Sequence, residues 1–156
     1  MHGILKLLAI LALFAAPAQA VEPRDGWIVH ETNKSYADLV QAVRDAVSEA
    51  PIAIVTQASA SDGARMQGHT IPGNRVFGLY RNDYARRMLD ASVAAGIEAP
   101  IRLYVTEQAD GTATLSYKTP SHVFAPYAEE GGAALRALAD ELDAVFEDVA
   151  RAAVAE

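Results

Sequence analysis

The sequence contains no cysteine. Disulfide bonds and thiolate metal sites are therefore excluded, and the stability of the fold must come from a hydrophobic core. Acidic residues outnumber basic residues by 20 to 13, which gives a formal net charge of −7. Proteins that bind nucleic acids or anionic membranes need a basic surface. We therefore expect neither kind of partner.

No apolar run is long enough to cross a membrane. The longest, residues 7–16, has roughly half of the ~20 residues that a membrane-spanning helix needs. It follows Lys6 and precedes Ala18-Gln19-Ala20, which is the pattern of a secretory signal peptide. We predict cleavage between Ala20 and Val21 and a periplasmic or secreted protein without a stable membrane anchor.

Common catalytic and cofactor-binding motifs are missing as well. No Ser stands in a G-x-S-x-G elbow, and Ser121 and His122 are neighbours, whose side chains point to opposite sides of an extended segment. The glycines within residues 68–74 have neither the spacing of a phosphate-binding loop nor a following Gly-Lys-Ser/Thr. We expect no serine nucleophile and no cofactor.

The histidines leave two alternatives open. After the signal peptide the chain has His30, His69 and His122, none of them at the helical spacing of a metal-ligand pair. Met66 lies close to His69 and, with His122 as a third ligand, these residues could form a soft copper site of a metal-stress protein. Alternatively, His69 or His122 could act as the general acid or base of an enzyme.

The first third of the mature chain predicts a strand, a helix and a second strand. Residues 26–33 alternate like a strand, and residues 52–58 form a short apolar run typical of a buried strand. Between them, Ser35 is a natural N-cap with Asp38 three residues on, and Pro51 ends the helix. One apolar stripe predicts the buried side of this helix: Tyr36, Leu39, Val40, Val43 and Val47.

The middle of the chain predicts a loop, a strand and a second helix. Residues 59–74 are polar with three glycines, and a loop of this length is usually functional or partly helical. A strand over 75–80 follows. The next helix is expected to be capped by Asn82 or Asp83 and closed by Gly96. Its inward face consists of Tyr84, Met88, Ala91 and Ala95.

Residues 101–106 and 112–117 alternate like the two strands of a hairpin. A two-residue turn would pair Val105 with Ser116 and place polar groups beside the core. A three-residue loop, Ala109 to Gly111, pairs Val105 with Leu115 instead. We predict the longer loop, with Gly111 at positive φ forming a bulge.

The chain closes with a long helix from about Ala133, whose two sides differ in polarity. The succession of strands and helices predicts one α+β domain, residues 21–156, with an antiparallel sheet covered by helices on one face. The apolar side of the helix contains Leu135, Leu138, Leu142, Val145, Phe146 and Val149, and the acidic side contains Asp140, Glu141, Asp143, Glu147 and Asp148.

Several polar and aromatic residues are candidates for a small-molecule site. Arg81 and Asn82 stand where a helix begins, so that its N–H groups and a guanidinium could meet an anion. Tyr104 alternates with core-facing residues and is expected to line a second, less buried surface. The remaining candidates are His69 in the long loop, Arg75 and Tyr80 on the middle strand, and Tyr117 and His122 at the end of the hairpin.

The mature chain resembles the domain-of-unknown-function family 302 over nearly its whole length. The resemblance is carried by Arg81-Asn82, by Ala99-Pro100-Ile101-Arg102 and by Tyr117-Lys118-Thr119-Pro120, in this order along the chain. It implies a sandwich of strand, helix, four strands and closing helix, similar to the TATA-binding-protein fold and often a homodimer, with an extra short helix between strands. It implies no activity and no catalytic residues.

Two positions depart from common members of that family. Ile101 stands where many members have Cys, and Thr119 stands where many have Asn or Asp. A thiol function elsewhere in the family would therefore be absent here. Taken together, these observations favour an exported, non-catalytic module that binds a small molecule or a protein.

Overall fold

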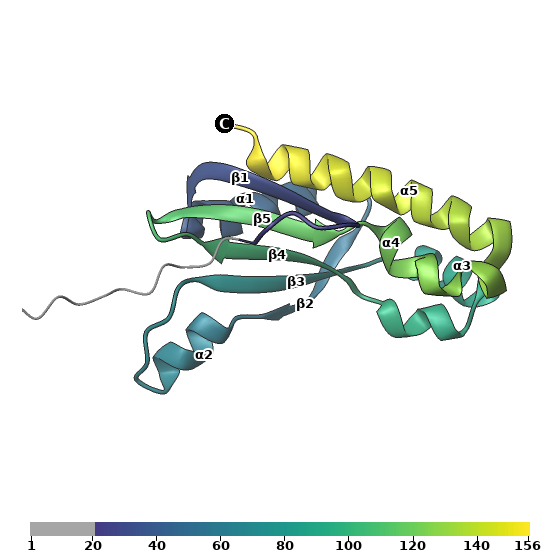
Figure 1. The fold of residues 1–156 in the computed structure, drawn as a ribbon, viewed down its shortest axis with the longest axis horizontal. Helices are drawn as coiled ribbons and strands as arrows, with labels where there is room; N and C mark the ends of the chain where they lie inside the picture. The colour runs from purple at the N-terminus through teal and green to yellow at the C-terminus, as the bar shows by residue number, and fades with distance from the viewer. Residues whose placement is uncertain (1–20) are drawn as a thin grey trace, which may run out of the picture.

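The computed structural model describes residues 21–156, so the predicted signal peptide lies outside the described residues. Its centre is a five-stranded antiparallel sheet in the order β1-β5-β4-β3-β2, shown in Figure 1. This confirms the predicted α+β class. The strands are β1 (Trp27–Ser35), β2 (Ala53–Ala58), β3 (Asn74–Tyr80), β4 (Ile101–Glu107) and β5 (Thr112–Lys118).

Helices cover one face of this sheet. The helices α1 and α5 pack against each other on that face, and α3 packs against α5 (Figure 1). The helices are α1 (Tyr36–Ser48), α2 (Ala60–Met66), α3 (Asn82–Ala91), α4 (Pro120–Phe124) and α5 (Ala128–Val154), with short 3-10 turns η1 (Ala94–Glu98) and η2 (Ala125–Tyr127).

The core lies between the sheet and these helices. Alternation along β4 and β5 turns Leu103, Val105 and Leu115 toward the helices, and all three are fully buried. The apolar stripes of α1 and α5 meet them, with Leu39, Val43 and Phe146 fully buried. Each large apolar side chain buried here contributes about 1.5–3 kcal/mol to the stability of the fold, and together they hold the two layers in contact.

The helix α1 begins and ends where the sequence predicted. The Ser35 hydroxyl accepts a hydrogen bond from the backbone N–H of Asp38 at 3.2 Å and donates one to the Asp38 carboxylate at 2.7 Å. The helix begins at Tyr36 and ends at Ser48, ahead of Pro51. A single local motif therefore specifies where this helix starts.

The predicted hairpin register is also confirmed. Leu103 pairs with Tyr117 and Val105 with Leu115, as the three-residue loop requires. Gly111 has φ +85°, a conformation that is readily available only to glycine. The register places all core residues of β4 and β5 on one face of the sheet.

The prediction of a buried strand over residues 52–58 is wrong. Within β2 only Ile54 is partly buried, and Val55 is 51% exposed. The strand pairs with β3 alone and forms an edge of the sheet, so that one of its sides has no neighbouring strand. The apolar residues of β2 are therefore mostly exposed because the strand lies at the edge of the sheet, and not in its interior.

The ends of the second predicted helix also need correction. The N-cap of α3 is Arg81 rather than Asn82 or Asp83, and its side chain forms no capping hydrogen bond. The helix ends at Ala91, and Gly96 lies in the separate turn η1. The chain between them changes direction because Ser92 has an extended backbone.

The connection from β5 to α5 is more helical than predicted. His122 lies in α4 rather than on a loop, and the Thr119 hydroxyl caps this short helix by accepting from the His122 N–H. The final helix begins at Ala128, but Gly132 has φ 58° and interrupts it. Its regular part therefore starts near Ala133, as predicted.

Residues 59–74 are partly helical, since they contain α2, which lies beside β3. Across residues 21–156, no helix combines the length and the apolar character needed to cross a membrane.

Candidate functional site

The face of the sheet turned away from α1 and α5 presents ordered rows of side chains. The strand registers place Trp27 opposite Lys118, and Arg102 opposite Gly78, in one row. The next row runs from Val29 through Ser116, Tyr104 and Val76 to Ala58, and a third contains Glu31, Thr114, Thr106 and Asn74. We call this surface the open face.

A groove of about 500 Å³ runs over the open face. All five strands contribute to it, and α2, η1 and α4 each add one residue at its edge. Small side chains make the hollow and larger ones form its walls. Its lining on the open face consists of Trp27, Ala58, Asn74, Val76, Arg102, Tyr104, Ser116 and Lys118, and its edge includes Ala60, Glu98 and Val123.

Two hydroxyl groups on the open face are buried without a partner. Ser116 is fully buried and Thr106 is 9% exposed, and neither side-chain oxygen has a hydrogen-bond partner within the described residues. The neighbouring Thr114 hydroxyl, by contrast, accepts from Gln108 Nε2 at 2.6 Å. A buried hydroxyl without a partner costs about 1–3 kcal/mol. Ser116 is one of the residues that line the groove.

Positive charge gathers at one end of the groove around Trp27. The Lys118 ammonium lies 5.6 Å from the centre of its ring, and the Arg24 guanidinium lies 5.0 Å from it. Arg102 follows in the same row of the sheet. Glu98, in the turn just before β4, lines the same groove, and its carboxylate accepts a hydrogen bond from the Tyr127 hydroxyl at 2.8 Å.

Only one side chain among the predicted site residues faces this groove, namely Tyr104. The others that make the groove were missed, although part of the signal was present. The predicted pairing of Leu103 with Tyr117 places Tyr104 opposite Ser116 and Arg102 opposite Lys118. Combining the alternation with the register would have found these residues.

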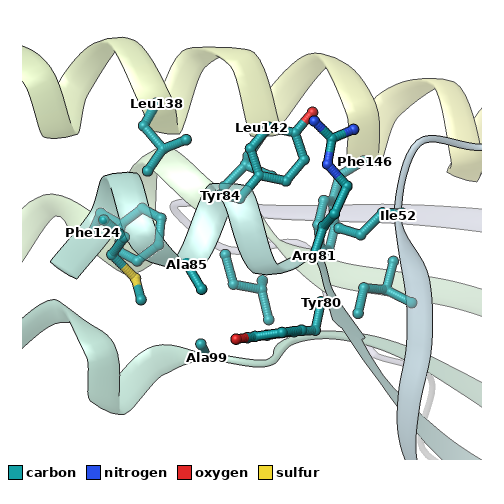
Figure 2. A pocket seen from close by; sticks show the side chains of 13 residues that line it. Ile52, Tyr80, Arg81, Tyr84, Ala85, Ala99, Phe124, Leu138, Leu142 and Phe146 are labelled. Atoms are coloured by element: carbon teal, nitrogen blue, oxygen red, sulfur yellow. The ribbon is translucent and has the colours of Figure 1, made fainter. Parts of the chain in front are cut away.

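Tyr80, Arg81 and Asn82 lie together at the start of α3, outside the groove. The Arg81 side chain forms an ion pair with Asp83 and donates to the Pro51 carbonyl at 2.8 Å. Its guanidinium lies 4.1 Å from the centre of the Tyr84 ring, and Figure 2 shows the two side chains next to each other. The hydrogen-bonded Arg81 lowers the pKa of Asp83 to about 2. The guanidinium therefore has a structural role, because it links the start of α3 to the segment just before β2.

The space beneath this cluster is a packing gap rather than a ligand site. It measures about 30 Å³, the volume of one water molecule in the liquid. Tyr80 borders it, while Asn82 is exposed and does not. The rest of its wall is mainly apolar (Figure 2): Ile52, Leu79, Tyr84, Ala85, Met88, Ala99, Ile101, Phe124, Leu138, Leu142 and Phe146.

Arg75 faces the opposite side from the groove and binds α2. Its register partner is the core residue Val105, and its guanidinium pairs with the Asp62 carboxylate. Partial burial opposes ionisation of Asp62, but the charge of Arg75 and its hydrogen bond outweigh this and lower the Asp62 pKa. The pair holds α2 against β3.

Tyr117 also lies on the helix side. Its side chain is 3% exposed, and its ring centroid lies 5.7 Å from that of Phe146 in α5. Burial, with smaller contributions from Glu147 and Asp143, raises the pKa of Tyr117 to about 12. The residue borders the groove, but its ring is part of the core.

This shift predicts a loss of stability at alkaline pH. Because the Tyr117 pKa rises from about 10 to about 12 on folding, its contribution is complete below pH ~10 and is lost as the pH rises toward 12. We expect Tyr117→Phe to remove on the order of 2 kcal/mol of this decline, measured by urea unfolding between pH 8 and 11.5. Tyr104→Phe serves as the control. An unchanged slope in Tyr117→Phe would contradict this assignment.

The structure does not bring the proposed metal ligands together. Met66 is 85% exposed at the end of α2, and His69 is exposed just after it. His122 lies in α4, against Gly26, at the opposite end of the sheet (Figure 1). Within residues 21–156, no group of three or more His, Asp or Glu side chains is placed to hold a metal ion.

Comparison with known proteins identifies relatives of the same architecture. The family model described as "Domain of unknown function DUF302" matches residues 28–153. A crystal structure described as an uncharacterized conserved protein DUF302 from Bacillus stearothermophilus superposes with a TM-score of 0.66 at 13% sequence identity. The match covers 83% of this chain and 96% of that one. At 13% identity this match shows a shared fold and nothing more. A search of curated proteins found no match.

Proposed function

Because this chain belongs to the DUF302 family, a family of unknown function, we propose a function from the groove itself. The protein is a non-catalytic module that binds a small molecule on the open face of its sheet. The observation that carries this proposal is the fully buried Ser116 hydroxyl, which has no partner within the described chain and lines a groove of about 500 Å³.

The form of the groove supports a small molecule as the occupant. Its volume falls within the roughly 300–1,000 Å³ of ligand pockets, which combine apolar walls with a few polar groups. Tyr104, Val76 and Trp27 supply apolar surface, and Ser116 supplies a polar group. A protein partner would need a contact area of about 800 Å² on each side, whereas the groove is a local hollow.

Export forms part of the same proposal. Residues 1–20 have the charged, apolar and small-residue regions of a signal peptide, and this part of the proposal rests on sequence alone. The homodimer implied by the family resemblance likewise stays a prediction.

The groove can be tested with Trp27 as a built-in reporter, because it is the only tryptophan of the chain and lines the groove. We expect 1-octanol and octanoate, which do not absorb at the wavelengths used, to change Trp27 emission in a saturable way. Ala58→Phe should weaken binding of both by about tenfold or more, because Ala58 faces the groove and a phenyl ring would fill it.

Val55→Phe is the matched control. Val55 lies on the same strand, is 51% exposed and does not line the groove. It adds a ring of the same size to β2 outside the site, and we expect it to leave binding unchanged. A wild-type protein that shows no saturable change with either compound would overturn the proposed function.

A further inference from the structure

The chemical character of the side chains changes from row to row along the open face. Its first row contains Lys118 and Arg102, its second row Ser116 and Tyr104, and its third row Thr114, Thr106 and Glu31. Lys118 and Arg102 therefore lie at one end of the groove, and Ser116, Tyr104 and Val76 form its middle. Of the third row only Asn74 lines the groove, while Glu31 and Thr114 lie outside it. A ligand that fits this order has an anionic end and an apolar body.

The cations at this end have no carboxylate partner. Five arginines in residues 21–156 form ion pairs with Asp or Glu, but within that range neither Arg102 nor Lys118 has a carboxylate within 4.0 Å. The whole chain has a net charge of −7, so acidic groups are plentiful. Two unpaired cations beside an unpaired hydroxyl therefore point to a partner that comes from outside the chain.

The nearest acidic side chain does not neutralise them. Glu98 lines the groove from η1, four residues before Arg102, but its carboxylate accepts from the Tyr127 hydroxyl and forms no ion pair within 4.0 Å with Arg102 or Lys118. Ser116 lies two residues from Lys118 on the same face of the sheet. Its hydroxyl has no hydrogen-bond partner within the described residues, and Ser116, Lys118 and Arg102 line the same groove.

We propose that the groove binds an amphiphilic carboxylate, with the carboxylate between Arg102 and Lys118 and an alkyl or aryl body along Tyr104 and Val76. This inference rests on the proposed function, because it names the ligand class of the same groove. The Ser116 hydroxyl donates to the carboxylate, and the apolar body covers the wall that is exposed without it.

The test compares two probes that differ only in the head group, with Trp27 emission as the readout. We expect octanoate to bind about tenfold more tightly than 1-octanol, the gain of two exposed charge contacts. Raising the NaCl concentration from 10 mM to 500 mM should reduce this difference, because salt screens exposed charges. Octylammonium should bind more weakly than either compound.

A pair of arginine variants locates the effect. Arg102→Gln should reduce the preference for octanoate from about tenfold to about threefold, because Lys118 remains, and should leave the 1-octanol Kd unchanged. Arg86→Gln removes the same charge from an exposed position on α3 and should leave both values unchanged. An Arg102→Gln protein that keeps the full preference for octanoate would overturn the assignment of the head-group site.

The outcomes separate this inference from the proposed function. Equal affinities for octanoate and 1-octanol, or tighter binding of octylammonium, would overturn the anionic ligand class while the groove remains a binding site. Absence of saturable binding by either probe would overturn the proposed function and this inference together.

Discussion

Replacing Phe146 by alanine is expected to lower the free energy of unfolding by about 3–5 kcal/mol. Phe146 is fully buried, its ring packs on Tyr117 from β5, and it borders the gap of about 30 Å³ beneath α3. Since that gap already persists between rigid elements, the surrounding side chains have little means of collapsing into the larger hole. A loss of this size is a large share of the 5–15 kcal/mol that stabilises a typical domain.

Urea unfolding followed by circular dichroism measures this effect. Leu89→Ala provides the control, because Leu89 is 45% exposed on α3 and should cost far less. A dry apolar cavity accepts benzene, so saturating benzene should restore part of the stability of Phe146→Ala and leave the wild type unchanged. A loss below about 1 kcal/mol would show that α5 is not anchored through this ring.

Replacing Leu103 by alanine should cost about 2–5 kcal/mol. Leu103 is fully buried on β4, the middle strand of the sheet, between Phe77 on β3 and Tyr117 on β5. Strands on both sides hold the backbone in place, so the cavity is not filled by a movement of β4. The side chain belongs to the helix side, and Trp27 should still report binding in the groove below the unfolding midpoint.

Val76→Ala provides the comparison for Leu103→Ala in the same urea experiment. Val76 is partly buried and faces the groove from the neighbouring strand β3. We expect a loss of about 1 kcal/mol, because only partly buried apolar surface is removed. Equal losses in the two variants would contradict the division of the sheet into a packed face and an open face.

Much of the local structure could be predicted because it depends on neighbouring residues. The Ser35 cap, the register of the hairpin and the positive φ of Gly111 each follow from a few residues in sequence, since hydrogen-bond capping and turn geometry are short-range. The apolar stripe of α5 likewise predicts its buried side. These local features were sufficient to predict that the protein belongs to the α+β class.

Predictions failed where a residue's environment comes from distant segments. The apolar run of β2 suggested burial, but the order of strands places it at an edge. Arg81 looked like part of an anion site, but Asp83, Tyr84 and the Pro51 carbonyl occupy its guanidinium. Each case depends on a contact that no local pattern contains.

For the candidate site, too, some features follow from the sequence and others only from the tertiary structure. By itself, the sequence determined that Tyr104 and Arg102 point away from the core and that they lie opposite Ser116 and Lys118, because alternation and turn length decide this within one hairpin. Only the tertiary structure placed Trp27 on one side of that hairpin and β3 and β2 on the other. The groove depends on this strand order, which is decided by packing between distant segments, and it therefore becomes visible only in the folded sheet.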